Sequence, residues 1–387
     1  MTNFNNTPKT FDELLTFSRA LASFAQDADG LFYSVESNEP RFNTGGLALE
    51  SGSTNLLLHC RDLSNAAWTT EATIARAKDA IGIDGAANSA TTLTDNDGTT
   101  NAYVRQIVTL SAVVQDCVAS VFFGKTGTAK YPAMSFEITG ARYDTVTINS
   151  LTGAMYSATS GATYFIESFG SFWRLSIMIR NTTANTFSSV VIHPALLTGS
   201  ATGSIIADFA MIEQGRSTAS SPISTTTATV TRPSESAVNA LFSTWGRQQI
   251  FTMLLEIENF QMTPAGGDIL SLYKTGTDRI RISSDPGSGG RFALISAMDT
   301  GGSKIQHFTA TQSAKIAISC GESAVIKSVN GASASDALTS AAYSDITSLG
   351  IGRGQATTNP PQSMTIKRIE FWPKASTSAE LEALTAS

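Results

Sequence analysis

The clearest pair of residues whose types and spacing could do chemistry is Glu256 and Glu258, in the segment LLEIENF. On a β-strand, residues i and i+2 share a face about 7 Å apart, a separation that some glycoside hydrolases use for their two carboxyl groups. The residues that alternate with them are apolar and would face a core: Phe251, Met253, Leu255 and Ile257. We therefore expect a strand with both glutamates on its outward face, and we favour a solvated charged face over a catalytic pair.

A second candidate is the segment TDNDGTT, in which Asp95 and Asp97 match the first two ligand positions of a calcium-binding loop. Gly98 stands at the wrong position for that loop, and Gln106 replaces the glutamate expected at its end. The three histidines are scattered, with no partner at metal-ligand spacing. We expect an Asp-Gly turn and no metal or other cofactor, with a structural Ca²⁺ ion as the alternative.

Composition excludes several classes of protein. The net charge is −6, and no basic run is present, which argues against nucleic-acid binding. No apolar stretch approaches the roughly 20 residues that span a bilayer, and the first residues lack the apolar core of a secretory signal. Cys60, Cys117 and Cys320 are isolated, which argues against a disulfide framework or a zinc ribbon. These features predict folding in a reducing cytoplasm, without membrane insertion.

The elements that position these residues are short β-strands. Segments such as YVRQIVTL, CVASVFF and WRLSIMIR are rich in β-branched and aromatic residues, and Gly, Asn and Asp separate them. The pattern predicts an all-β protein with two tandem antiparallel β-sandwich or jelly-roll domains, and the resemblance described below implies that they are lectin-like. Asp29-Gly30 predicts a hairpin turn, and Thr377 with Glu380 predicts a capped C-terminal helix. Thr10 and Glu13 show the same capping spacing near the N-terminus.

We place the domain boundaries where the composition changes. Residues 1–50 are predicted to be a short N-terminal anchoring arm, and residues 51–215 a jelly roll. Residues 216–235 form a Thr/Ser-rich connector that is extended and able to pair with a sheet edge, because its charge is low and its β-propensity high. Residues 236–387 form the second sandwich.

Several of these segments resemble bacteriophage structural proteins. NLLLHCRDLSNAAW at 55–68, YVRQIVTLSA at 103–112, GSFWRLSIMI at 170–179 and EQGRSTASSPISTTTATVTRP at 213–233 resemble a carbohydrate-binding-module-like jelly roll and the connector that ends it in such proteins. KIAISC, SVNGA, LGIGRG and TIKRIEFWPKASTSAELEALT are similar to the concanavalin-A-like (laminin-G-like) sandwich that follows it. Proteins of this class are tail-fibre, minor tail and head-decoration or head-fibre proteins.

The resemblance implies a non-enzymatic virion protein, made in the host cytoplasm and projecting from tail or capsid. It implies attachment to other virion proteins through the N-terminal arm, assembly as a homotrimer, and recognition of host cell-surface polysaccharide. A capsid cement protein with no ligand is one alternative. A polysaccharide-degrading glycoside hydrolase is disfavoured, because lectin-fold glucanases carry Glu-x-Asp-x-x-Glu where this chain reads EIENFQ.

Tryptophan and arginine residues are the candidates for glycan contact. Sugar rings stack on exposed aromatic faces, and Trp68 and Trp372, together with Arg353, are the residues that we select. The competing interpretation is burial, because tryptophan in a sandwich usually contributes a large area to the core. For Trp372 that interpretation predicts contact with the C-terminal helix.

Overall fold

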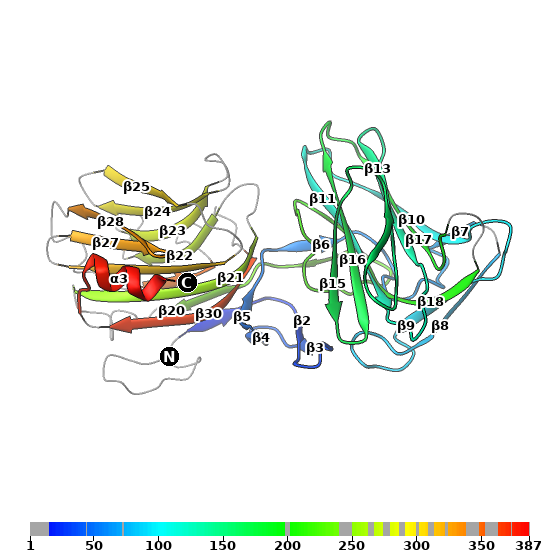
Figure 1. Cartoon of the computed structure of the whole chain (residues 1–387), viewed down its shortest axis with the longest axis horizontal. Coiled ribbons are helices and arrows are strands. Elements are labelled where there is room, and N and C mark those ends of the chain that lie inside the picture. Colours follow the sequence, from blue (N-terminus) through cyan, green and yellow to red (C-terminus); the bar gives the residue numbers. More distant parts are fainter. Residues whose placement is uncertain are drawn as a thin grey trace. The chain divides into compact units, whose positions relative to one another are not determined.

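The computed structural model describes residues 15–43, 45–71, 73–197, 202–239, 250–261, 267–273, 279–285, 291–298, 302–308, 313–321, 324–337, 348–352, 363–372 and 374–386. Nearly all regular structure in them is antiparallel β-sheet (Figure 1), as the sequence predicts. No helix of these residues is long and apolar enough to cross a membrane. The predicted helix start at Thr10–Glu13 lies outside the described residues.

The chain forms two compact units, and each is built from more than one segment. The first, which we call the split sandwich, comprises Met1–Ala22, Glu36–Gly52 and Pro233–Ser387. The second, the jelly-roll unit, comprises Ser23–Val35 and Ser53–Arg232.

The jelly-roll unit contains two six-stranded sheets. One has the order β14-β13-β12-β17-β10-β7, and the other β15-β16-β11-β18-β9-β8. Two short pairs, β2-β3 and β6-β19, complete the unit. The strands are β2 (Ser23–Gln26), β3 (Phe32–Val35), β6 (Ser53–Asn55), β7 (Thr69–Glu71), β8 (Ile74–Ala80), β9 (Ala90–Asp95), β10 (Tyr103–Thr109), β11 (Gln115–Gly124), β12 (Ala133–Ile138), β13 (Arg142–Ile148), β14 (Met155–Ala158), β15 (Thr163–Phe169), β16 (Phe172–Asn181), β17 (Phe187–His193), β18 (Gly203–Gln214) and β19 (Val230–Arg232).

Alternation of apolar and polar residues assigns the two faces of each sheet. In the first sheet, Val104, Ile192, Met134 and Val146 lie opposite one another in neighbouring strands, and all are fully buried in one core. Because successive side chains of a strand point to opposite faces, the residues between them lie on the outer face.

The β2-β3 hairpin turns at Gly30, as predicted, with a φ of +82°. Only glycine adopts such a φ readily, and a Cβ here would overlap with the backbone of Gly170. Phe32 of this hairpin is buried and its ring lies 5.8 Å edge-on from that of Phe122. The hairpin is therefore part of the jelly-roll unit.

The predicted connector is packed against the same unit. Its last residues form β19, which pairs with β6 at Val230–Asn55 and Thr231–Thr54. At its start, the buried carboxylate of Glu213 accepts hydrogen bonds from Ser53 and Ser220. Of the predicted connector, residues 230–232 alone form a strand, and its partner β6 belongs with it to a separate two-stranded sheet.

The split sandwich contains two seven-stranded sheets, with the orders β1-β20-β29-β22-β23-β24-β25 and β28-β27-β26-β21-β30-β5-β4. Its elements are β1 (Thr16–Ser18), β4 (Arg41–Asn43), β5 (Gly46–Leu49), β20 (Ser236–Asn239), β21 (Phe251–Gln261), β22 (Gly267–Tyr273), β23 (Arg279–Asp285), β24 (Arg291–Met298), β25 (Gly302–Phe308), β26 (Ala314–Cys320), β27 (Ala324–Val329), β28 (Ala332–Ala337), β29 (Ser348–Ile351), β30 (Ser363–Trp372) and α3 (Ser378–Thr385).

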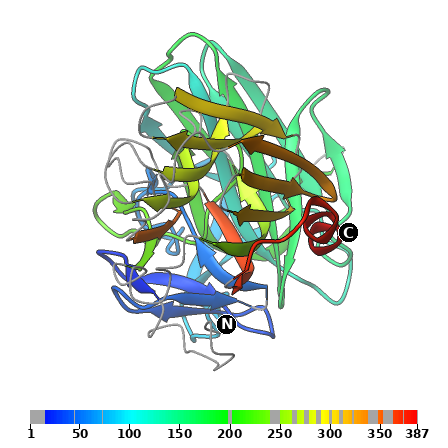
Figure 2. The same ribbon diagram turned by 90° about the vertical axis from the view of Figure 1, so that its left-hand side faces the viewer.

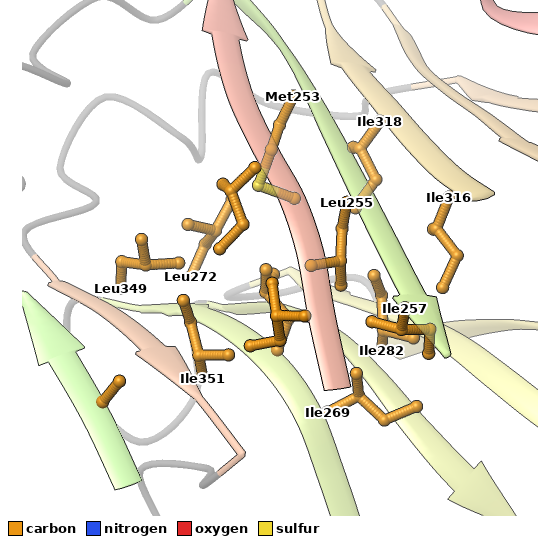
Figure 3. Close-up of a cluster of buried hydrophobic side chains, with 14 of the residues drawn as sticks. Met253, Leu255, Ile257, Ile269, Leu272, Ile282, Ile316, Ile318, Leu349 and Ile351 are labelled. Carbon is orange, nitrogen blue, oxygen red and sulfur yellow. The ribbon is translucent and has the colours of Figure 1, made fainter. Parts of the chain in front are cut away.

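The core of the split sandwich lies between these sheets. Met253, Leu255 and Ile257 of β21 project into it, as the alternation predicts, and meet side chains such as Ile269 and Leu349 from the other sheet (Figure 3). On the opposite face of β21, Leu254 packs against Leu381 of α3. Helix α3 (Figures 1 and 2) therefore covers part of the outer face of this sheet. The helix begins with the predicted capping box of Thr377 and Glu380.

The described residues of the predicted N-terminal arm are strands of the two units, which corrects the boundaries that we drew from the sequence. Strand β1 pairs with β20 at Phe17–Ala237, and β5 pairs with β30 at Leu47–Ile366, so both are part of the split sandwich. An anchoring role for residues 1–50 stays a prediction.

Candidate functional site

The predicted carboxylate pair lies on the outer face of β21, and each glutamate faces a cation. Glu256 lies opposite Lys315 on β26 and Arg368 on β30 in the strand register. Glu258 Oε1 is 2.9 Å from Lys367 Nζ, and this hydrogen bond raises the pKa of Lys367. These contacts fit a solvated, charge-paired strand face.

The Asp95–Asp97 loop is closed by its own backbone. The buried Asp95 carboxylate accepts hydrogen bonds from the Asp97 and Ala102 amides, at 2.9 and 2.8 Å. Asp97 accepts from the amide and hydroxyl of Thr99. Within the described part of the chain, no group of three or more His, Cys, Asp or Glu side chains could hold a metal ion.

The selection of Trp68 as a glycan-contacting residue is wrong. Its side chain is 1% exposed and belongs to the core of the jelly-roll unit, where Nε1–H donates to the His59 carbonyl at 3.3 Å. Trp372 packs beside Leu381 and Leu384 of α3, so the predicted contact with the C-terminal helix is confirmed. Arg353 lies outside the described residues.

A group of residues that the sequence analysis did not select stands out on the jelly-roll unit. It is the outer face of the sheet β13-β12-β17-β10-β7, which we call the polar face. By register, its side chains form rows across the strands, such as Tyr103–His193–Ala133–Thr147 and Arg105–Val191–Ser135–Thr145. The residues in the middle are small and mostly buried, whereas Ile107, Tyr143 and Phe187 are 51%, 50% and 38% exposed.

Buried polar atoms without partners gather on this face. Arg105 Nε, Thr147 Oγ1 and His193 Nδ1 make no hydrogen bond to any described residue, and neither does Asn101 Oδ1 in the loop before β10. Buried polar groups in folded proteins are nearly always paired, so each exception requires an explanation. Three of these atoms lie on the polar face and the fourth in the adjoining loop, and the same unit holds others elsewhere, such as Ser176 Oγ.

An ion pair lies at the centre of the polar face. Arg105 Nη2 is 3.4 Å from Glu137 Oε2 and 3.3 Å from Ser189 Oγ, and the Ser189 hydroxyl donates to Glu137 at 3.0 Å. The two charged side chains are 31% and 25% exposed. Both therefore keep donors and acceptors that a ligand hydroxyl can reach.

Aromatic rings border this pair. The ring of Tyr103 contacts that of His193 edge-on at 5.3 Å, and its hydroxyl lies 3.4 Å from Glu71. Burial and the Glu71 carboxylate raise the pKa of Tyr103. Burial lowers the pKa of His193 to about 4, so its imidazole is neutral at physiological pH. Neutral tyrosine and histidine rings beside a charged pair can bind a polyhydroxylated ligand through stacking and hydrogen bonds.

The sequence signal for this face is weak. In YVRQIVT, the outward positions are Tyr103, Arg105, Ile107 and Thr109, which read as an ordinary solvated strand face. The pairing that aligns them with His193 and Glu137 joins residues that are distant in the sequence, and it is visible only in the structure.

No protein-family model and no curated protein sequence matches this chain. Among solved structures, it is similar to the CBM40 domain of the Ruminococcus gnavus IT-sialidase bound to alpha2,3 sialyllactose. The identity is 14% and the TM-score 0.31, over 36% of this chain and 84% of that one. It is also similar to domains LG4-5 of the mouse laminin alpha1 chain, with 9% identity and a TM-score of 0.28, over 70% of this chain and 88% of that one. A Trypanosoma rangeli sialidase matches with 10% identity and a TM-score of 0.30, over 76% of this chain and 60% of that one.

Proposed function

We propose that this chain is a non-enzymatic glycan-binding protein of a bacteriophage virion, and that the polar face of the jelly-roll unit is its glycan site. The observation that carries the glycan site is the partly exposed pair of Arg105 and Glu137 on a face that also exposes aromatic side chains. Sugars present many hydroxyl groups and apolar ring faces, and this face offers partners for both.

The phage assignment is supported by the sequence segments that resemble fibre, minor tail and head-decoration proteins. In this proposal the chain assembles as a homotrimer, contacts other virion proteins through residues 1–50, and projects to the host surface. It works without a catalytic centre or cofactor, and Glu256 and Glu258 serve as part of a charged strand face.

Binding of the full-length protein to a glycan array tests the glycan site. We expect saturable binding, and we expect Tyr143→Ala and Arg105→Ala each to weaken it by about tenfold or more, because aromatic and arginine side chains dominate binding energies. Phe165→Ala is the matched control, since Phe165 is 39% exposed on β15 of the other sheet.

The outcomes separate a glycan site on this face from one elsewhere. Normal binding by the Phe165→Ala protein and weak binding by the other two supports the proposal. Equal binding by all three variants would place the site away from the polar face. If the folded protein binds none of the glycans on the array, glycan recognition is excluded altogether.

A further inference from the structure

We propose that the polar face selects uncharged oligosaccharides over acidic ones. This inference rests on the proposed glycan site and specifies the chemistry of its ligand.

The outward positions of the five strands carry three charged side chains. Glu71 lies on β7, Arg105 on β10 and Glu137 on β12. The remaining outward residues are tyrosine, serine, threonine, the apolar residues Ala133, Val191, Ile107 and Phe187, and a histidine that is buried and uncharged at neutral pH. The sum is one cation and two carboxylates, on a chain whose net charge is −6.

The single cation of the face, Arg105, already has an acidic partner. Arg105 Nη2 faces the carboxylate of Glu137 and the hydroxyl of Ser189. A sugar carboxylate or sulfate that approached Arg105 would meet Glu137 beside it and Glu71 at the end of the same face. Like charges placed side by side oppose binding, whereas an uncharged hydroxyl has no such cost.

A cation paired with a carboxylate can bind the hydroxyl groups of a sugar. The guanidinium group has five N–H donors and the carboxylate has about four acceptor positions, so neither is saturated by the other. A hydroxyl group both donates and accepts, and it can therefore bridge the two. Ser135 Oγ and Thr145 Oγ1, which are 2.7 Å apart in the row of Arg105, extend the uncharged part of the polar face.

The spacing of the aromatic residues indicates a ligand of several rings. Tyr103 lies on β10 and Tyr143 on β13, and β17 and β12 lie between them. Three steps between neighbouring strands span roughly 14 Å, at about 4.8 Å each, and the register places Tyr143 four positions further along the strands than Tyr103. A single sugar ring is shorter than this distance, so a ligand that contacts both tyrosines must be an oligosaccharide that crosses the strands.

The test uses the full-length protein on an array of neutral oligosaccharides, printed beside the same oligosaccharides carrying sialic acid, uronic acid or sulfate. We expect the neutral member of each pair to bind more tightly. We expect Glu137→Gln, which frees Arg105 from its carboxylate, to strengthen binding of the acidic members about three- to fivefold, the range for charges that are partly exposed. Added salt should reduce this gain.

Glu167→Gln is the matched control, because it makes the same change in net charge on the exposed edge strand β15 of the other sheet. It should leave the ratio of neutral to acidic binding unchanged. Tighter binding of the acidic members by the unmodified protein would overturn this inference and leave the glycan site intact. Equal shifts for Glu137→Gln and Glu167→Gln would also overturn it, and the absence of all binding would remove both proposals.

Discussion

Glu235 of the split sandwich and Arg105 of the jelly-roll unit lie in contrasting environments. In the split sandwich, the fully buried Glu235 carboxylate binds Arg19 Nη1 at 3.0 Å, Arg41 Nε at 2.7 Å and the Glu50 amide at 2.8 Å. In the jelly-roll unit, Arg105 lies on an outer face, and its Nε has no partner among the described residues. The first arrangement joins three segments of the chain through a buried carboxylate, whereas the Arg105 side chain is 31% exposed and can meet a ligand. Two β-sandwiches thus place charged side chains differently, and the segments packed around each charge determine whether it is buried.

The largest effect should come from removing the buried charge of Glu235. Glu235→Gln keeps the shape of the side chain but leaves Arg19 and part of the Arg41 guanidinium as buried, uncompensated charge. We expect a loss of about 3–5 kcal/mol in the free energy of unfolding, measured by urea denaturation. Glu258→Gln removes an exposed partner from Lys367 and should change the stability far less, because solvent screens this pair. Similar losses for the two variants would contradict the inference that the buried Glu235 carboxylate stabilises the fold far more than the exposed Glu258 carboxylate does.

The tryptophans provide a second comparison between the units. Trp68→Ala leaves a large cavity in the jelly-roll core, for which we expect a loss of about 3–5 kcal/mol. Trp372→Ala removes a partly buried side chain beside α3 and should cost about 1–2 kcal/mol. Urea denaturation followed by circular dichroism measures both losses. A small loss for Trp68→Ala would mean that the ring is solvated and would restore it as a candidate for ligand contact.

The last comparison concerns pH and belongs to the polar face. Burial lowers the pKa of His193 from 6.5 to about 4. Between these values the unfolded chain takes up a proton that the folded chain does not, so acidification favours unfolding. We expect stability to fall as the pH drops from about 6.5 to 4, and we expect this part of the decrease to disappear in His193→Gln. A pH profile that is the same for both proteins would show that the imidazole is solvated.

Local signals in the sequence predicted much of the fold. The alternation through Met253 and Leu255 placed one face of β21 in the core, and the turn at Gly30 and the cap at Thr377 were found from their own residues. The prediction that residues 1–50 form a separate segment was wrong, because Phe17 pairs with Ala237 and no local pattern indicates so distant a pairing.

The site was harder to predict for a related reason. Trp68 precedes β7 in a turn, where no periodicity assigns the ring to a face. The outward residues of β10 looked like a solvated surface, because hydrogen-bond satisfaction depends on neighbours from other strands. That Arg105 and His193 carry unpaired atoms could be recognised only after the strands were placed in register.

The pairing of β1 with β20 sets the order in which the molecule can be completed on a ribosome. Phe17 is synthesised long before Ala237, its strand partner. At translation rates of 5–20 residues per second, the wait is roughly 10–40 s, during which the jelly-roll unit emerges and has time to fold. The early apolar segment must stay soluble throughout that interval, and cutting the chain before residue 236 would release two pieces of which neither holds a complete pair of seven-stranded sheets.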